Sequence, residues 1–210
     1  MAEDDWFRSS AWDEQAQVLF RKKLASARTQ KWFYLRVKAD AIAEDHPQDA
    51  LALYQEYLDA QDDDVPPILY AMAIIHWKQG REDELFSCLD RAMGSQGMGL
   101  GAMGVMENAF ISALLGREDR YARAMDLFRP FDAAAQAQAG RPFARSFAGA
   151  FGSAIILKHL GEREQAREAA RIALEWMERD TGPIPGHPKL GLPPQVPQEW
   201  QDMMGRIAQN

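Results

Sequence analysis

The sequence predicts an all-α fold made of stacked helical hairpins, and two observations carry that prediction. A short polar phrase with a glycine near its start occurs three times, as QGREDE at 79–84, LGREDR at 115–120 and LGEREQ at 160–165. Each copy follows an apolar pattern of helical spacing and opens another such pattern. The three glycines are 36 and 45 residues apart. A turn that recurs roughly every 20–50 residues is typical of a helical repeat protein.

The composition is that of an ordinary folded protein, because 47% of the 210 residues are hydrophobic and 26% are charged. No apolar stretch is long enough to span a bilayer. We expect no signal peptide, because the first five residues are acidic where basic residues would stand. The one cysteine, Cys88, lies between Leu85 and Leu89 on an apolar helix face and is interpreted as a core residue. Since no internal disulfide can form, a reducing, cytoplasmic location is favoured.

The net charge of −7 is concentrated near the start of the chain. Residues 1–64 hold 14 acidic and 8 basic side chains, whereas residues 141–210 hold 8 and 9. Nucleic-acid binding depends largely on basic contacts to phosphate, so an acidic chain without a basic stripe argues against it. The bases at 21–23 fall instead in the last turns of a predicted helix, where positive charge is favourable. We therefore expect neither a nucleic acid nor a membrane as a partner.

The N-terminal helices are predicted from caps and helical spacing. The first is expected at about 11–28, with Ser10 as its N-cap and Asp13 completing a variant of the capping box. A second follows at about 30–44. Pro47 then suits the first position of a third helix, because its missing N–H has no partner there anyway.

The remaining helices are predicted around the glycine turns, as pairs at 66–79 and 82–93, 102–115 and 119–128, and 141–160 and 162–179. Pro130 is expected to kink or stop the chain, and the alanine-rich run 133–139 to add a helical turn or two. The segment 180–197, rich in proline and glycine, is expected to be extended. A short helix at 198–208 closes the chain.

The residues after each turn follow a common pattern, with apolar side chains at the fifth, ninth and twelfth positions. They are Leu85, Leu89 and Ala92 after Gly80; Tyr121, Met125 and Phe128 after Gly116; Ala166, Ala170 and Ala173 after Gly161; and Ala50, Tyr54 and Tyr57 after Asp45, which stands in place of a glycine. This pattern resembles tetratricopeptide repeats over about residues 30–179. The family's preferred alanine is kept throughout only in the third copy. The stretch Asp5-Trp6-Phe7-Arg8, with Trp12, is similar to the opening of a group of uncharacterised bacterial helical-repeat proteins.

The resemblance implies a single domain over 1–210, a right-handed α-solenoid of about four hairpins with additional helices at both ends. In such stacks the first helix of each pair lines a concave face, which here would include Leu35, Ala39 and Ile42 and would be unusually apolar. The partner-binding residues that the resemblance implies are Trp32, Tyr70, Ile74, Trp77, Met103, Met106, Phe110, Phe151, Ile155 and His159.

An open face of this kind would exceed the usual size of an exposed apolar patch, so something should cover it. The alternatives are a partner's helix or peptide, a second copy of the chain in a homodimer, the chain's own proline-rich tail, or terminal helices that turn these residues into core. The predicted function is a non-catalytic protein–protein interaction module of a bacterial cytoplasm, such as an adaptor, chaperone or immunity protein. A structural subunit or self-associating scaffold is the alternative, and an enzyme is the function that the sequence supports least.

Catalytic, cofactor and metal sites are not predicted. No two of the four histidines have the spacing of a metal site, although His76 and His159 occupy related segments of different repeats and could approach each other. The carboxylates at 82–84 and 118–119 stand at helix starts, where negative charge is favourable without any reaction. The glycines at 97–101 follow no strand and precede no Gly-Lys-Ser/Thr, so they do not form a phosphate loop.

Overall fold

The computed structural model describes residues 5–61, 65–94, 101–139, 146–181, 192–193 and 195–209, with the backbone alone at 5, 94, 101–104 and 131–139. All regular structure in these ranges is helical, so the all-α prediction is confirmed. The contacts divide the chain into two compact units, residues 1–101 (unit 1) and 102–210 (unit 2). The expectation of a single domain stays a prediction.

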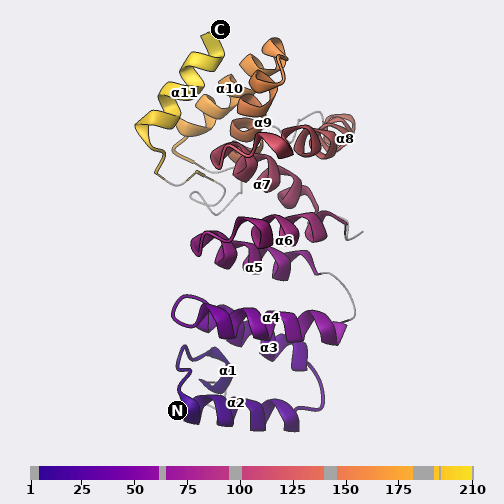
Figure 1. Cartoon of the computed structure of the whole chain (residues 1–210), viewed down its shortest axis with the longest axis vertical. Helices are drawn as coiled ribbons and strands as arrows, with labels where there is room; N and C mark the ends of the chain where they lie inside the picture. Colours follow the sequence, from indigo (N-terminus) through magenta and orange to yellow (C-terminus); the bar gives the residue numbers. More distant parts are fainter. Residues whose placement is uncertain are drawn as a thin grey trace. The chain divides into compact units, whose positions relative to one another are not determined.

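The described residues of unit 1 form six helices, drawn from indigo to purple in Figure 1: α1 (Asp5–Arg8), α2 (Glu14–Ser26), α3 (Lys31–Ile42), α4 (Pro47–Gln61), α5 (Pro66–Lys78) and α6 (Glu82–Gly94). Unit 2 begins in the first turn of α7 (Gly101–Leu114) and continues with the 3₁₀-helix η1 (Glu118–Arg120), α8 (Tyr121–Ala139), α9 (Phe147–His159), α10 (Arg163–Met177) and α11 (Gln198–Gln209). Within the units, α3 packs with α4, α5 with α6, and α9 with α10 as hairpins.

The three repeated phrases form the same helix stop. Gly80, Gly116 and Gly161 have φ angles of +68°, +63° and +81°. The residue after each glycine donates its backbone N–H to the carbonyl five positions before it, over 2.9 Å: Arg81 to His76, Arg117 to Ser112, and Glu162 to Leu157. This is the Schellman arrangement, which satisfies the last free carbonyls of a helix and needs a left-handed residue, usually glycine.

The hairpin of α3 and α4 closes without such a glycine. Asp45 stands at the corresponding position and does not adopt a positive φ. The turn is held instead by the backbone N–H of His46, which donates to the carbonyl of Ile42 over 2.8 Å. Pro47 is the first residue of α4, as predicted.

The apolar positions that follow the four turns are buried. The twelve side chains at the fifth, ninth and twelfth positions are each at most 7% exposed: Ala50, Tyr54, Tyr57, Leu85, Leu89, Ala92, Tyr121, Met125, Phe128, Ala166, Ala170 and Ala173. The second helix of each hairpin therefore presents the same face to its core. Cys88 is also buried, as expected.

Gly152 marks the closest approach between two helices of unit 2. A Cβ atom placed on Gly152 of α9 would lie 2.6 Å from the backbone carbon of Ala109 and the backbone nitrogen of Phe110 in α7. Real Cβ atoms do not approach a backbone so closely. Glycine therefore lets α7 and α9 pack backbone to backbone.

Two predicted helix starts are wrong. The N-cap of α2 is Asp13, not Ser10, and its side chain accepts a hydrogen bond from the backbone N–H of Ala16 over 2.8 Å. Helix α9 begins at Phe147 rather than near residue 141, because Ser146 Oγ accepts from the N–H of Gly149 and caps it. In α2 the true cap lies closer to the helix than the predicted one, and in α9 Ser146 caps a helix for which no cap was predicted.

Pro130 does not end the helix that contains it, because α8 continues through this residue to Ala139. A proline costs the helix one backbone hydrogen bond, but the alanine-rich sequence that follows has a strong helix propensity. Helix α11 at Gln198–Gln209 agrees with the prediction, whereas the short helix α1 was not foreseen as a helix. Most of the extended segment 180–197 lies outside the described residues, as do the connections at 62–64 and 95–100.

The conformational demand of the turn can be measured with Gly116→Ala. No atom lies within 4 Å of an added Cβ at Gly116, so the cost is purely that of a left-handed backbone. We expect the free energy of unfolding to fall by about 1–2 kcal/mol in chemical denaturation. Gly205→Ala is the matched control, because Gly205 lies in α11 with open space around it, and alanine there should stabilise by about 1 kcal/mol. Equal effects of the two substitutions would contradict this account of the turn.

Candidate functional site

Helix α5 carries an apolar stripe that is partly exposed. Tyr70, Ile74 and Trp77 follow one another at intervals of four and three residues and so share one face of the helix. Ile74 is 52% exposed and Trp77 is 39% exposed, while Tyr70 is partly buried. The opposite face of α5 is core, with Ile68, Leu69, Met72, Ala73, Ile75 and His76 buried.

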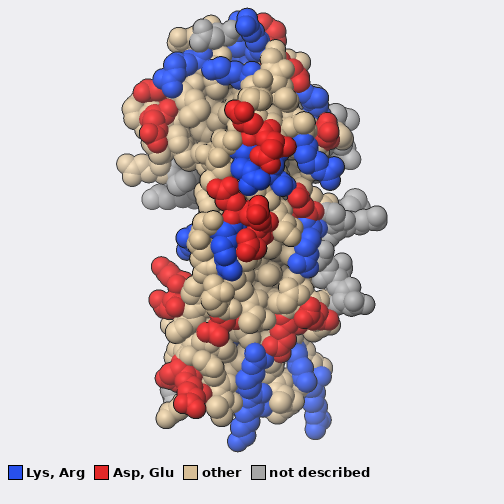
Figure 2. Space-filling model, viewed as in Figure 1, with Lys and Arg blue, Asp and Glu red and all other residues tan. Residues whose placement is uncertain are grey.

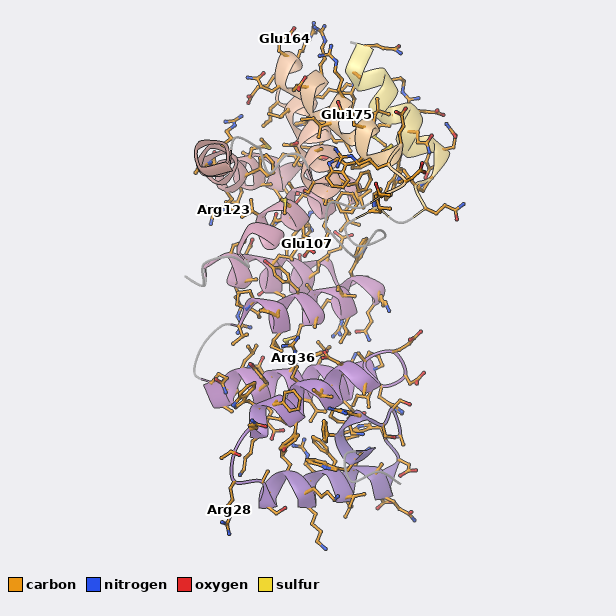
Figure 3. The ribbon with its side chains drawn as sticks, turned by 180° about the vertical axis from the view of Figure 1, so that it is seen from behind. Arg28, Arg36, Glu107, Arg123, Glu164 and Glu175 are labelled. Atoms are coloured by element: carbon orange, nitrogen blue, oxygen red, sulfur yellow. The ribbon has the colours of Figure 1, made fainter. Side chains whose placement is uncertain are left out.

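A cleft of about 490 Å³ opens beside this stripe, between α3, α4 and α5. It is lined by Asp40, Ala43, Glu44, Pro47, Tyr54, Ala71, Ile74, Ile75, Lys78 and Gln79. Its lining combines an apolar part with two carboxylates and one ammonium group. Figure 3 shows the side chains of unit 1 from behind, with Arg36 of α3 labelled.

The carboxylate of Asp40, which lines the cleft, is held in place by two neighbouring side chains. The hydroxyl of Tyr54 donates a hydrogen bond to Asp40 Oδ1 over 2.5 Å, and Arg36 Nε lies 3.7 Å from Asp40 Oδ2. Burial, and then the hydrogen bond to Asp40, raises the pKa of Tyr54 far above its usual value, so the hydroxyl remains a donor. The carboxylate of Asp40 is thus held from α4 as well as from its own helix.

In unit 2 the chain covers its own apolar face. Helix α11 packs on α10 and α9. The Trp200 ring lies 5.9 Å from the ring of Phe110 in α7 and 5.0 Å from that of Phe151 in α9, between ring centroids. Phe151 is fully buried and Phe110 is partly buried. Of the alternatives for this face, coverage by a terminal helix is the one found at Phe151, because Trp200 of α11 lies against it.

The other predicted binding residues differ in their surroundings. Trp32 is 42% exposed and contacts Tyr57 edge to face, with 6.2 Å between ring centroids. Met106 and Ile155 are partly buried, and the Met103 side chain lies outside the described residues. The remaining residues assigned to the first part of the concave face, Leu35, Ala39 and Ile42, are core, with at most 2% exposure.

The two histidines that could approach each other lie in different units. His159, in α9, is exposed; its Nδ1 lies 3.4 Å from Glu118 Oε1, and its ring stacks edge-on against Tyr121 at 5.1 Å. His76, in α5, is buried. Among the residues that the structure describes, no group of three or more His, Cys, Asp or Glu side chains could hold a metal ion.

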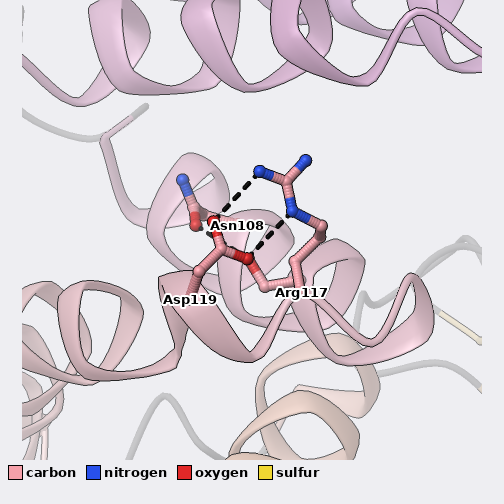
Figure 4. A network of polar contacts seen from close by, with 4 residues as sticks. Asn108, Arg117 and Asp119 are labelled. Carbon is pink, nitrogen blue, oxygen red and sulfur yellow. Dashed lines mark hydrogen bonds and ion pairs between the residues drawn. The ribbon is translucent and has the colours of Figure 1, made fainter.

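The carboxylates at the turn before α8 have a structural arrangement. Arg117 Nε and its terminal nitrogen donate to the two oxygens of Asp119 over 2.9 and 3.0 Å, as Figure 4 shows together with Asn108. This bidentate pair lowers the pKa of Asp119, so its carboxylate is charged at neutral pH. It braces the turn between α7 and α8.

Sequence reasoning missed the polar part of the cleft. Arg36, Asp40 and Glu44 follow one another at four-residue intervals along and just beyond α3, which places them on one side of the helix. That spacing was visible in the sequence. The role of Tyr54 as a partner of Asp40 was not, because its position predicts only burial.

A buried lysine was also missed. Lys38 is 1% exposed, and its ammonium group donates to the backbone carbonyls of Ser9 and Ala11 over 2.7 and 3.2 Å. Burial lowers the pKa of Lys38, and the Trp12 ring lies 5.4 Å from the ammonium nitrogen. Lys38 thereby fastens the segment before α2 to α3. In unit 2, burial raises the pKa of Glu107, which is labelled in Figure 3.

The two units differ in charge. Residues 1–101 hold 18 acidic and 11 basic side chains, which is the whole net charge of −7, whereas residues 102–210 hold 13 of each. On the face shown in Figure 2, acidic and basic side chains are interspersed with uncharged surface. The unit with the open cleft is therefore the acidic one.

The chain matches no protein-family model, and neither a curated protein nor a solved structure shows significant similarity to it. In the part of the chain that the structure describes, none of the helices has the length and apolar character needed to cross a membrane.

The burial of His76 on the core face of α5 predicts a loss of stability in mild acid. Its side chain is 7% exposed with no hydrogen-bond partner at Nδ1, and burial and the nearby Arg81 lower its pKa from 6.5, against a smaller opposing effect of Glu84. Below 6.5 the unfolded chain takes up a proton that the folded chain resists. The free energy of unfolding should therefore fall as the pH drops below about 6.5.

Urea denaturation of the native chain and of His76→Gln at several pH values between about 5 and 7.5 checks this prediction. The free energy of unfolding of the variant should fall less as the pH drops, because glutamine does not titrate. If both proteins lose stability in parallel over this range, His76 is not the group responsible.

Proposed function

We propose that this chain is a non-catalytic protein-binding module that takes a segment of a partner protein in the cleft of unit 1. The observation that carries the proposal is the contrast between two equivalent residues. Ile74 in α5 and Phe110 in α7 both stand six positions before a turn glycine. Phe110 is packed by Trp200, whereas Ile74 is 52% exposed beside an open cleft.

The exposed apolar area of the stripe limits the binding free energy that it can supply. Full burial of a large apolar side chain contributes about 1.5–3 kcal/mol, so the half-exposed Ile74 and Trp77 together supply about 2–3 kcal/mol. That is less than the roughly 4 kcal/mol of even a millimolar complex. A partner must therefore also use the cleft itself, including the side chains of Asp40, Glu44 and Lys78.

The arrangement of the charged groups favours binding over catalysis as the proposal. Asp40 is engaged by both Tyr54 and Arg36, which suits a fixed hydrogen-bond acceptor rather than a group that exchanges protons. The proposal further includes the right-handed tetratricopeptide-like arrangement of the hairpins and a bacterial cytoplasmic setting. The resemblance of the turn phrases and of the buried positions after them supports the former. A second copy of the chain on the same stripe is the alternative that the exposed Trp77 favours.

The variant Ile74→Ala/Trp77→Ala tests the binding role. Because Ile74 is 52% exposed and Trp77 is 39% exposed, we expect the thermal unfolding midpoint to stay within a few degrees of the native one. Capture of the partner from an extract of the native cell by the immobilised chain should fall on the order of tenfold, measured by quantitative mass spectrometry. Phe110→Ala should instead lower the free energy of unfolding by about 3 kcal/mol, because Phe110 packs against Phe151 and Trp200.

Leu19→Ala is the matched control, because Leu19 lies in α2 of the same unit, is 47% exposed and does not line the cleft. It should capture the partner as the native chain does. Equal capture by all variants would reject the cleft as the binding site. Loss of a homodimer in the double variant would show that the occupant is a second copy.

A further inference from the structure

Helix α2 is the outermost helix of unit 1, with α1 between it and α3 (Figure 1). Phe20 and Leu24 are buried on its inner side. Because an α-helix has 3.6 residues per turn, Val18 points away from Phe20. At 64%, Val18 is the most exposed large hydrophobic side chain in the part of the chain that the structure describes. The outward face of α2 therefore has an apolar side chain at its centre.

The charges around Val18 are arranged so that this face is complementary to itself. Glu14 stands four residues before Val18 and Lys22 four residues after it, so all three share one side of the helix. In a symmetric dimer both chains use the same surface, and a residue n positions before the two-fold axis on one helix faces the residue n positions after it on the other. With the axis at Val18, two antiparallel copies of α2 place Glu14 of each chain opposite Lys22 of the other and bring the two valines together.

The other charged side chains of α2 and of its N-cap are engaged within unit 1. Asp13 accepts a hydrogen bond from the N–H of Ala16, Arg21 forms an ion pair with Glu56 of α4, and Lys23 Nζ lies 5.7 Å from the ring centre of Trp6. Arg8, Arg28 and Lys31 lie outside the helix. The side chains of Glu14 and Lys22 are both exposed, and neither forms a hydrogen bond or an ion pair with the rest of the described chain. One negative and one positive charge thus remain available on the outward face.

We propose that this face of α2 is the interface of a homodimer, in which two copies of the helix pack antiparallel about a two-fold axis at Val18 and form two ion pairs between Glu14 and Lys22. The surface is separate from the cleft, so the inference goes beyond the proposed function. One pair of short helices buries less than the roughly 1,200 Å² at the low end of standard interfaces, so the dimer is a weak one. We expect a Kd on the order of 100 μM.

Sedimentation velocity of the full chain from about 10 μM to 1 mM measures this association. Glu14→Lys sets two lysines opposite each other at both pairs, and Lys22→Glu does the same with two glutamates. We expect each variant to raise the Kd on the order of tenfold or more. Glu175→Lys is the matched control, because Glu175 is exposed in α10 and its replacement changes the net charge as Glu14→Lys does. It should associate like the native chain.

An equimolar mixture of Glu14→Lys and Lys22→Glu tests the antiparallel geometry itself. Each variant alone has like charges at both pairs, whereas a mixed dimer has opposite charges at both. We expect the mixture to associate about as tightly as the native chain, and the double variant Glu14→Lys/Lys22→Glu to do so as well. Far-UV circular dichroism of every variant shows whether its helices are intact.

Cross-linking locates the two-fold axis. In a Cys88→Ser background, Val18→Cys places the two thiols at the axis, where a disulfide can form under mild oxidation. Leu19→Cys is the control, because Leu19 is also exposed, at 47%, but lies about 100° further around the helix. We expect covalent dimer to form on the order of tenfold faster with Val18→Cys. Equal rates would indicate random collisions and overturn the proposed axis.

Four further results would overturn the inference. The native chain remains a monomer at about 1 mM, or the mixture of charge variants associates no more tightly than either variant alone. Glu14→Lys changes the thermal unfolding midpoint but not the association, so that its charge acts only on its own helix dipole. Ile74→Ala/Trp77→Ala abolishes the dimer while the charge variants preserve it, which would place the interface on α5. The proposed function fails separately, if Ile74→Ala/Trp77→Ala captures its native partner unchanged.

Discussion

A turn with a left-handed glycine fixes how the helix before it and the helix after it are oriented about their axes. Most of this structure depends on that constraint. At Gly80, Gly116 and Gly161 the same pair of backbone hydrogen bonds ends one helix, and the next begins within a few residues. At these turns the fifth, ninth and twelfth residues after the glycine reach the core, as they also do after Asp45, where the turn is held without a left-handed residue. A sequence that preserves the turn can vary those side chains from alanine to phenylalanine, provided that they remain apolar.

The same orientation determines which face of the first helix in a hairpin does not reach the hairpin's core. In α5 that face carries Ile74 and Trp77, and in α7 it carries Phe110. The chain buries the second of these with Trp200, an aromatic contact that contributes beyond its buried area. Within unit 1, α1 packs on α3, with Phe7 and Tyr34 in contact, and Ile74 and Trp77 of α5 remain partly exposed. The asymmetry between the units is thus a matter of where the terminal helices pack.

Much of this could be predicted from the sequence, because local signals determine it. The turn glycines, Pro47 and the buried positions after each turn follow from backbone sterics and helical spacing. The N-cap of α2 was misassigned because Ser9, Ser10 and Asp13 all suit a helix start. Ser146 was missed because Pro142 suits the first turn of a helix and suggested an earlier start. Two features depend on segments distant in sequence, which no local pattern reveals: the burial of Phe151 by Trp200 and the hydrogen bond between Tyr54 and Asp40. The arrangement of the hairpins as a right-handed solenoid stays a prediction.

The most direct measurement of the central claim is the rate at which a thiol reacts at each of the two equivalent positions. In a Cys88→Ser background, Ile74→Cys and Phe110→Cys can be labelled with a small maleimide under native conditions. The account predicts that the thiol at Ile74 reacts nearly as fast as in the unfolded chain, and that the thiol at Phe110 is strongly protected by Trp200. Similar protection at both positions would contradict the account, because the face of α5 would then be covered like that of α7.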